Sequence, residues 1–315
     1  MLIQSQIFYI LTNIYRKSKL NGLFSALWTV NFFVGKKWNL VVYVDKVFKR
    51  LIFIFKGRCK NFDFLRLSTY FCGMLIIKKV DKYFCFCYNS DMQSNVEEML
   101  NEHKDEFGKF KTILTESNKK FNLTAISDEN EVKIKHFYDS IAPERFFKYG
   151  ARVAEIGSGG GFPSVPLMIV RKDLKFTLIE STGKKCDYLK EVVESLSLNC
   201  EQVLNIRAED GAKDPFLREK FDVVTARAVA KLNTLSEYCL PYVKVGGTFI
   251  AYKGDGEDIG EAEKAISILG GKIEEIFEYE LPDGYGKRRA VIIKKVSATP
   301  SKYPRGNGKE RKNPL

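Results

Sequence analysis

From Met92 onward, apolar and polar positions recur with two clear periods. Between residues 96 and 114 the apolar side chains fall three or four positions apart among charged ones, which predicts one or two amphipathic helices. A turn with a helix cap is expected at residues 127–130, followed by a further helix from about 129 to 147. Residues 92–150 are therefore predicted to form an N-terminal helical segment.

From residue 151, short apolar runs alternate with amphipathic stretches. Strands are predicted near 151–156, 175–180, 201–206, 221–226, 246–252, 272–280 and 289–296, and helices near 164–171, 183–197, 230–243 and 257–269. This alternation predicts an α/β fold with a doubly wound, seven-stranded sheet. Only a short turn with Pro282 and Gly284 separates the last two strands, so we expect an antiparallel hairpin at the sheet edge.

Residues 1–91 show neither period, and their composition differs from the rest. They contain 15 Lys and Arg against four Asp, whereas residues 92–315 contain 36 basic and 35 acidic residues. Their longest uncharged run, 20–35, is shorter than the roughly 20 residues of a membrane span. We expect that translation starts at Met92 and that the atypical N-terminal extension 1–91 results from a mis-assigned start codon. A membrane-surface or nucleic-acid-binding extension is the alternative.

The stretch 153–166 predicts a strand, a glycine turn and the start of a helix. A dinucleotide fingerprint would require glycine at position 162, where the chain has Phe162. The pattern of Glu155, Gly157, Gly159 and Gly161 instead resembles the first motif of Rossmann-like methyltransferases that use S-adenosylmethionine. A carboxylate beside the turn suits that cationic ligand, while a glycine-rich loop in an unrelated α/β protein is the alternative.

Polar residues follow the next three strands at the sheet edge where ligands of doubly wound folds bind. Glu180 follows the second strand, and a carboxylate there can accept hydrogen bonds from both ribose hydroxyls. Ala208 and Glu209 follow the third strand, where they could recognise an adenine edge, and Arg227 follows the fourth. Each alone could be a solvated loop residue, but together they predict one cofactor pocket.

The segment after the fourth strand also narrows the chemistry. It lacks the Asn/Asp-Pro-Pro-Tyr/Phe sequence typical of methyltransferases that act on exocyclic base amines, and Cys239-Leu-Pro241 is not the Pro-Cys nucleophile of pyrimidine-C5 methyltransferases. An acceptor that already presents a lone pair, such as guanine N7, remains. Because such an atom needs no general base, we expect none, and the sequence does not identify catalytic residues. Alignment and electrostatic stabilisation would carry the reaction.

Six motifs together resemble the ribosomal RNA small subunit methyltransferase G family, also called glucose-inhibited division protein B. They are Asn122-Leu-Thr124, His136 with Asp139-Ser140, the stretch 155–163, Arg207-Ala-Glu209, Thr225-Ala-Arg-Ala228, and the ending Tyr303-Pro-Arg305 to Leu315. The resemblance covers 92–315 and implies a class I methyltransferase fold with cofactor contacts at Gly157, Phe162, Ala208, Glu209 and Arg227. It also implies methylation of N7 of one guanine in 16S rRNA, guanine 527 in the family's name. Ser164 departs from the family's usual glycine.

The charge distribution is consistent with an RNA substrate. Residues 286–315 contain ten Lys and Arg and one acidic residue, which suits RNA phosphates. We divide this part of the chain into an S-adenosylmethionine-binding domain at 151–298 and a basic tail at 299–315. The tail residues expected to contact phosphates are Lys302, Arg305, Lys309, Arg311 and Lys312. A disordered, solubilising tail is the alternative.

The sequence therefore predicts a cytoplasmic enzyme with S-adenosyl-L-methionine as co-substrate and no metal. The cysteines lack zinc-site spacing and are interpreted as reduced core thiols. The expected partner is 16S rRNA, the small ribosomal subunit or its precursor, with no DNA and no stable membrane association for 92–315. The alternatives are a non-catalytic S-adenosylmethionine- or RNA-binding regulatory protein, a small-molecule methyltransferase and, less favoured, a dinucleotide oxidoreductase.

Overall fold

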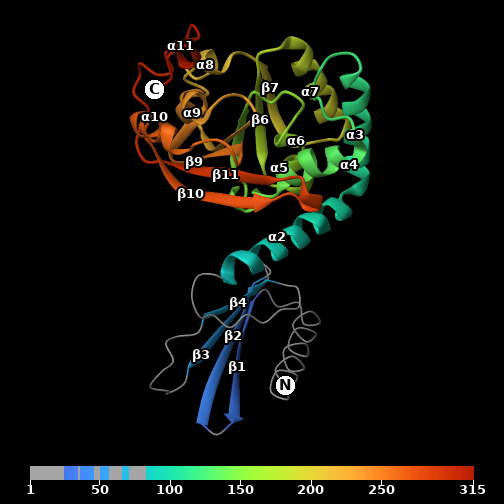
Figure 1. Cartoon of the computed structure of the whole chain (residues 1–315), viewed down its shortest axis with the longest axis vertical. Coiled ribbons are helices and arrows are strands. Elements are labelled where there is room, and N and C mark those ends of the chain that lie inside the picture. Colours follow the sequence, from blue (N-terminus) through green and yellow to red (C-terminus); the bar gives the residue numbers. More distant parts are fainter. Residues whose placement is uncertain (1–24, 35, 46–49, 57–65, 71–82) are drawn as a thin grey trace. The chain divides into compact units, whose positions relative to one another are not determined.

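The computed structural model describes residues 25–34, 36–45, 50–56, 66–70 and 83–315, with side chains from Met92 onward. The chain divides into two compact units, residues 1–91 and 92–315 (Figure 1). The first unit contains an antiparallel sheet in the order β1 (Ser25–Val34), β2 (Lys36–Asp45), β3 (Arg50–Lys56) and β4 (Arg66–Tyr70). We did not predict these strands. In β1, β2 and β3 apolar residues occupy consecutive positions and so hide the period of two, and β4 has only five residues. The uncharged run 20–35 contains β1.

The predicted amphipathic helices are α2 (Tyr83–Glu102), within which the second unit begins at Met92, and α3 (Lys104–Asn118). Their apolar stripe is buried, as the 3.6-residue period requires. The buried side chains on it are Val96, Leu100, Phe107, Phe110 and Leu114. No helix among the described residues is both long enough and apolar enough to cross a membrane.

The helix predicted over 129–147 is present but is not regular. It consists of α4 (Glu129–Glu131), the π-helix η1 (Val132–Tyr138), α5 (Asp139–Ile141) and the 3₁₀-helix η2 (Glu144–Phe146). The Asp128 side chain accepts a hydrogen bond from Glu131 N at 2.9 Å and caps its start. Pro143, which has no N–H to donate, separates α5 from η2.

The predicted seven-stranded sheet is confirmed, with the order β10-β11-β9-β8-β5-β6-β7 (Figure 1). In this sheet β11 runs in the direction opposite to that of the other six strands, so it is antiparallel to both β10 and β9. The predicted edge hairpin of β10 and β11 is therefore confirmed as well. The strands are β5 (Arg152–Ile156), β6 (Lys175–Glu180), β7 (Cys200–Asn205), β8 (Phe221–Arg227), β9 (Val243–Gly254), β10 (Gly271–Glu280) and β11 (Lys287–Lys295).

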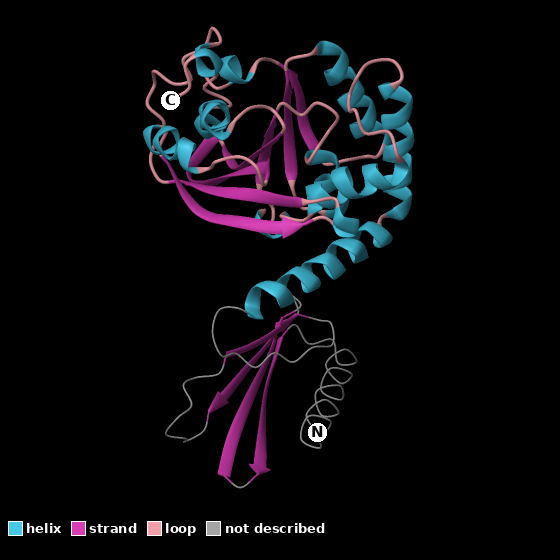
Figure 2. Cartoon of the chain, in the orientation of Figure 1, coloured by secondary structure: helices cyan, strands magenta, loops and turns pink. Residues whose placement is uncertain are grey.

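Helices cover both faces of this sheet (Figure 2). They are α6 (Ser164–Val170), α7 (Gly183–Ser195), α8 (Ala208–Gly211), α9 (Leu232–Cys239) and α10 (Glu263–Ile268), with the 3₁₀-helices η3 (Leu240–Tyr242), η4 (Gly260–Ala262) and η5 (Pro282–Gly284). One face is apolar, with Ala154, Val224 and Phe249 packed in the same core as Leu235 of α9. Because side chains alternate along a strand, Glu155, Thr225 and Tyr252 belong to the opposite face.

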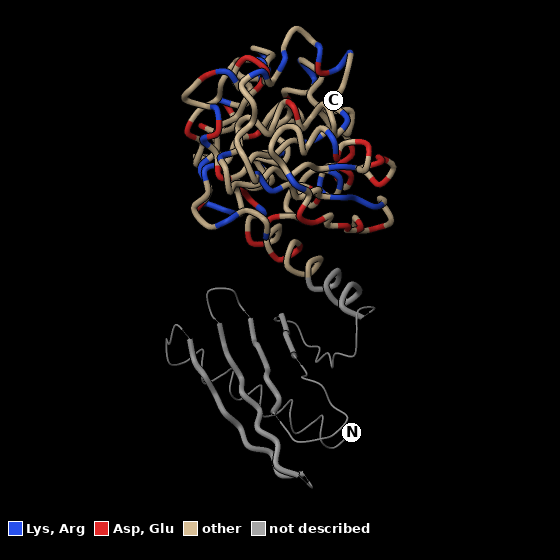
Figure 3. The backbone as a smooth tube through the Cα atoms, turned by 90° about the vertical axis from the view of Figure 1, so that its left-hand side faces the viewer, with Lys and Arg blue, Asp and Glu red and all other residues tan. Residues whose placement is uncertain are grey.

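The tail folds onto the second unit and ends in α11 (Lys309–Lys312). Arg218 donates hydrogen bonds to the carbonyl oxygens of Thr299 and Tyr303 at 2.9 and 3.0 Å. Arg305, one of the expected phosphate contacts, pairs with the buried carboxylate of Glu237. The alternative of a disordered tail is therefore wrong. Figure 3 shows basic and acidic positions interspersed along the rest of this unit.

Candidate active site

The glycine turn, residues 157–161, joins β5 to α6 at the carboxyl end of the sheet. Gly157 and Gly161 have φ angles of +73° and +87°, a region that favours glycine. A Cβ atom on Gly157 would lie 2.7 Å from Val229 Cγ2, and one on Gly161 would lie 2.6 Å from Val165 Cγ2. Conformation and packing therefore both require glycine at these two positions.

The backbone N–H groups of the glycine turn are mostly bonded inside the protein. Gly157 N and Ser158 N donate to the carbonyl oxygen of Ile179 at 2.8 and 3.2 Å, and Gly161 N donates to Ser158 O at 2.7 Å. Gly159 N donates to Glu180 Oε2 at 3.0 Å. The turn therefore does not present the set of free N–H groups that a pyrophosphate requires, which counts against the dinucleotide alternative.

Glu180 ends β6 beside the glycine turn, as the sequence predicts, and is 6% exposed. Besides Gly159 N, its carboxylate accepts a hydrogen bond from Thr182 N at 2.8 Å through Oε1. The Ser181 hydroxyl also lies 3.5 Å from Oε1, so Oε2 is the oxygen with a free lone pair for a ligand hydroxyl. The carboxylate is thus fixed by the backbone of two loops and keeps acceptor capacity.

Glu155 lies in β5 just before the turn and is completely buried. Its Oε2 accepts a hydrogen bond from the Ser164 hydroxyl, whereas its Oε1 has no partner among the described residues. Burial raises the pKa of this carboxyl from 4.5 to about 7. Its charge therefore changes within the neutral pH range.

Ala208 and Glu209 form the first turn of α8, directly after β7. The carbonyl oxygen of Ala208 accepts a hydrogen bond from the Tyr242 hydroxyl at 2.7 Å, which anchors this helix to the apolar core. Both residues are partly exposed. The structure thus places them at the same edge of the sheet as Glu180, one strand further along.

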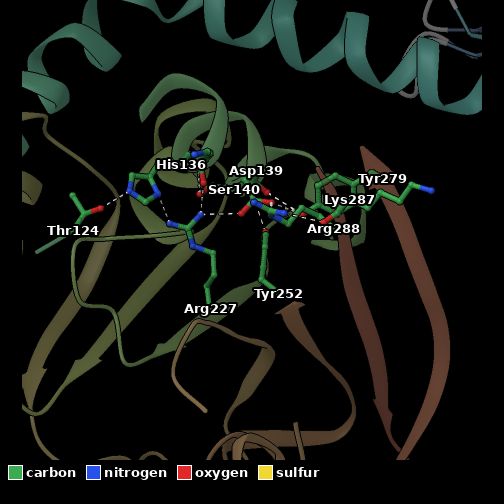
Figure 4. Close-up of polar contacts among 10 residues, drawn as sticks. Thr124, His136, Asp139, Ser140, Arg227, Tyr252, Tyr279, Lys287 and Arg288 are labelled. Carbon is green, nitrogen blue, oxygen red and sulfur yellow. Dashed lines mark hydrogen bonds and ion pairs between the residues drawn. The ribbon is translucent and has the colours of Figure 1, made fainter. Parts of the chain in front are cut away.

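Arg227 ends β8, and the helical segment above the sheet holds one side of its guanidinium (Figure 4). Its Nη1 donates to Lys135 O at 3.0 Å and to Asp139 Oδ2 at 2.9 Å, and its Nη2 donates to His136 Nδ1 at 2.9 Å. The side chain is 13% exposed. Arg227 was predicted from its place after the fourth strand, but its three partners were not.

His136 is a neutral imidazole with both nitrogens engaged. Its Nε2 lies 2.8 Å from Thr124 Oγ1, and its ring stacks on Phe162 with centroids 4.2 Å apart. Burial, together with the positive charge of Arg227, lowers its pKa from 6.5 to about 3. Because Arg227 donates to Nδ1, the proton must lie on Nε2, which donates to Thr124.

Two tyrosines, one from β9 and one from β10, complete this buried polar layer (Figure 4). The Tyr279 hydroxyl donates to Asp139 Oδ1 at 2.8 Å, and the Tyr252 hydroxyl donates to Ser140 O at 2.8 Å. Arg288 Nε lies 3.8 Å from Asp139 Oδ1. The sequence analysis singled out neither tyrosine.

The loop after β8 is held in a strained conformation by residues that the sequence did not indicate. Ala228 has a φ of +57°, which is unfavourable for a residue with a Cβ. Lys253 Nζ donates to Ala230 O at 2.6 Å and pairs with Glu257 at 2.9 Å. These contacts connect the loops after β8 and β9 next to the glycine turn.

A separate recess of about 190 Å³ lies between α2, η1 and the turn that joins β10 to β11, and none of its lining residues is a predicted site residue. They are Gln93, Glu97, Leu100, Asn101, Asn130, Lys133, Ile134, Tyr138, Pro282 and Asp283. Within the part of the chain that the structure describes, no cluster of three or more His, Cys, Asp or Glu residues could hold a metal ion.

The chain matches a protein family model, named relatives and solved structures. The family model described as rRNA small subunit methyltransferase G matches residues 103–283. Proteins named ribosomal RNA small subunit methyltransferase G are similar to the chain in Acetivibrio thermocellus (48% identity, 68% of this chain and 89% of that protein) and Lactobacillus johnsonii (44%, 69% and 94%). A solved SAM-dependent methyltransferase from Aquifex aeolicus covers 54% of this chain and 94% of its own, with 19% identity and a TM-score of 0.42.

Proposed function

The chain belongs to the rRNA small subunit methyltransferase G family and has the Rossmann-like fold of class I methyltransferases, and from this premise we propose its substrate and donor. The proposed reaction transfers a methyl group from S-adenosyl-L-methionine to N7 of a guanine in 16S rRNA, guanine 527 in the family's name. The observation that carries the proposal is the glycine turn: most of its N–H groups are bonded within the protein, and a buried carboxylate lies beside it.

The residues around the turn fit a cationic donor without phosphates. Glu180 is assigned to the ribose hydroxyls, because Oε2 keeps a free lone pair and Oε1 could exchange its 3.5 Å contact with the Ser181 hydroxyl. Ala208 and Glu209 are assigned to the adenine. Gly157, Gly159 and Gly161 allow the ligand to approach the backbone closely. Glu155, buried beneath the turn, would favour a sulfonium when it is ionised.

Arg227 and Phe162 are assigned to the methionine part of the donor. The Nε–H and the second N–H of Nη2 in Arg227 have no partner among the described residues. These two groups form one planar edge, which matches a carboxylate. Phe162 lies under both Arg227 and His136 and gives this edge a fixed, apolar floor.

The chemistry requires alignment more than proton transfer. Guanine N7 presents a lone pair at neutral pH, and the donor supplies an electrophilic methyl group when bound. His136 is not assigned as a general base, because Arg227 and Thr124 occupy its two nitrogens. The protein would hold nucleophile, methyl and leaving sulfur in line and stabilise the charge that the guanine gains.

The basic tail is assigned to RNA. Lys309, Arg311 and Lys312 are exposed on α11, and Arg311 Nη2 lies 3.5 Å from the carbonyl oxygen of Val229. Since a Cβ on Gly157 would touch Val229, the tail adjoins the loop that packs on the glycine turn. Phosphates bound there would bring the RNA to the proposed site. We place this reaction in the cytoplasm, on the small ribosomal subunit or its precursor.

Methyl transfer from radiolabelled S-adenosylmethionine to small subunits tests the proposal. Subunits from a strain that lacks the enzyme should accept label, and subunits already methylated should not. Reduction followed by aniline cleavage should then break the RNA at one guanine, as expected for N7-methylguanine. Donor binding without transfer would favour a non-catalytic protein, and transfer only to small molecules would favour the small-molecule alternative.

A further inference from the structure

We propose that His136 is a positioning residue of the donor site, a role that rests on the proposed function. As the neutral imidazole with its proton on Nε2, it connects Thr124 to Arg227. It thereby holds the Arg227 guanidinium with its Nε–Nη2 edge turned away from the protein partners and available to the donor's carboxylate.

The hydrogen bonds of Arg227 show why the orientation of its guanidinium depends on His136. Both N–H groups of Nη1 are bonded, to Lys135 O and Asp139 Oδ2. On Nη2, His136 Nδ1 is the acceptor among the described residues, at 2.9 Å. Without this acceptor the guanidinium could turn about its Nη1 bonds, and Nη2 would also lack a partner in a buried site. The second N–H of Nη2 forms part of the Nε–Nη2 edge proposed to bind the ligand. Loss of the His136 acceptor would therefore also leave this edge without a fixed orientation.

His136 is itself fixed from two sides. Its ring stacks on Phe162 with an interplanar angle of 18°, and its Nε2 donates to Thr124. The position of Thr124 is set by Asn118, whose Oδ1 accepts hydrogen bonds from Leu123 N and Thr124 N at 2.8 and 3.0 Å.

The same loop lies against the glycine turn. A Cβ atom on Gly160 would be 3.7 Å from the carbonyl oxygen of Leu123. The path from Thr124 through His136 to Arg227 therefore connects a loop that borders the glycine turn to the end of β8. The second of these places is the one assigned to the methionine part of the donor.

Two substitutions of His136 separate the two hydrogen bonds. In His136→Asn the amide oxygen takes the place of Nδ1, so the acceptor for Arg227 is kept while the donor to Thr124 is lost. In His136→Gln the amide nitrogen takes the place of Nε2, so the bond to Thr124 is kept and the acceptor for Arg227 is lost. Ser140→Ala is the matched control, because it removes a buried 2.6 Å hydrogen bond to His136 O from the same segment without touching Arg227.

The experiment measures calorimetric affinities for S-adenosylmethionine and for 5′-methylthioadenosine, which lacks the amino-acid part. We expect His136→Gln to weaken S-adenosylmethionine binding by about tenfold, as for a lost hydrogen bond to a charged group, and to leave 5′-methylthioadenosine unchanged. His136→Asn should recover most of the loss, Thr124→Val should give an intermediate loss, and Ser140→Ala should bind both ligands like the wild type.

Each other outcome overturns the inference in a recognisable way. Equal weakening of both ligands by His136→Gln would show a purely structural histidine, and no weakening would show that Arg227 does not depend on it. A wild-type protein that fails to bind S-adenosylmethionine would refute the proposed function itself, and the inference with it. If His136→Gln does not fold, the affinities of His136→Asn and Thr124→Val decide by the same comparison of ligands.

Discussion

The guanidinium of Arg305 and the carboxylate of Glu237 form two parallel hydrogen bonds, Nε to Oε1 at 3.0 Å and Nη2 to Oε2 at 2.7 Å. The Glu237 side chain is only 1% exposed, whereas that of Arg305 is 24% exposed. Arg305 N also donates to Glu237 Oε1 at 2.9 Å. A residue that charge alone assigns to RNA therefore holds the tail on α9.

Arg305→Ala should therefore destabilise the protein. It leaves the buried carboxylate of Glu237 without its partner, which typically costs about 3–5 kcal/mol. Urea unfolding measures the loss. Lys312→Ala, on the exposed side of the same tail, should stay within about 0.5 kcal/mol of the wild type. Equal stability of the two variants would show that the pair does not anchor the tail.

Neutralising the exposed basic residues of α11 should weaken RNA binding selectively. In the triple variant Lys309→Gln, Arg311→Gln and Lys312→Gln, each lost phosphate contact should reduce the log–log salt slope by about 0.7 to 0.9, while donor affinity stays unchanged. Lys175→Gln with Lys220→Gln is the matched control, because these exposed lysines lie at the amino ends of β6 and β8, away from the strand-end edge. A slope that changes equally in both variants would assign the tail to non-specific charge.

Glu180→Gln should weaken S-adenosylmethionine binding by about tenfold or more. The amide keeps the size of the side chain but replaces one charged acceptor with a donor, and a hydrogen bond to a charged group is worth about 1.5–3 kcal/mol. Calorimetry measures the affinity. Glu201→Gln is a suitable control, since Glu201 lies at the amino end of β7 and pairs with Arg152. Unchanged affinity in Glu180→Gln would remove Glu180 from the pocket.

Two buried groups should make stability depend on pH in opposite directions. The pKa of His136 is lowered from 6.5 to about 3, so its contribution is complete above pH 6.5 and is lost as the pH falls toward 3. The pKa of Glu155 is raised from 4.5 to about 7, so its contribution is complete below pH 4.5 and is lost as the pH rises through about 7.

Unfolding free energies between pH 4.5 and 7 separate these two contributions. Relative to the wild type, Glu155→Gln should lose more stability on acidification, because only the histidine contribution remains. His136→Asn should lose less stability, or gain some. Curves parallel to that of the wild type would contradict the assignment of these pKa values.

The sheet could be predicted from the sequence because each strand is a short apolar run bounded by turns, as in residues 152–156 and 175–180. The turn after Glu280 was short enough to require the antiparallel partner. The strands β1, β2 and β3 of residues 1–91 were missed, because apolar residues fill both alternating positions there. Periodicity reports burial on one face and gives no signal when neither face is polar.

Of the candidate site, only the residues that directly follow a predicted strand could be predicted from the sequence. Glu180 and Arg227 were found because they follow predicted strands. The contact of His136 with Arg227 joins residues 91 positions apart, and that of Glu237 with Arg305 joins residues 68 positions apart. Such pairs depend on how the helical segment and the tail pack on the sheet, and no local pattern encodes that.

Ser164 offers a last test, because this serine takes the place of the family's usual glycine and its hydroxyl donates to Glu155. The hydrogen bond favours the ionised carboxylate and so opposes the rise in pKa caused by burial. Ser164→Ala should raise the pKa of Glu155 further above 7, so that the carboxyl is neutral at pH 7. If the ionised carboxylate favours the sulfonium by about 1–2 kcal/mol, S-adenosylmethionine affinity should fall roughly tenfold at pH 7 and recover near pH 9. Calorimetric titrations from pH 6 to 9 measure how the affinity for S-adenosylmethionine depends on pH. In Glu155→Gln the carboxyl is absent, so this variant shows the pH dependence that comes from the donor itself. An identical pH profile for wild type and Glu155→Gln would show that Glu155 does not sense the donor's charge.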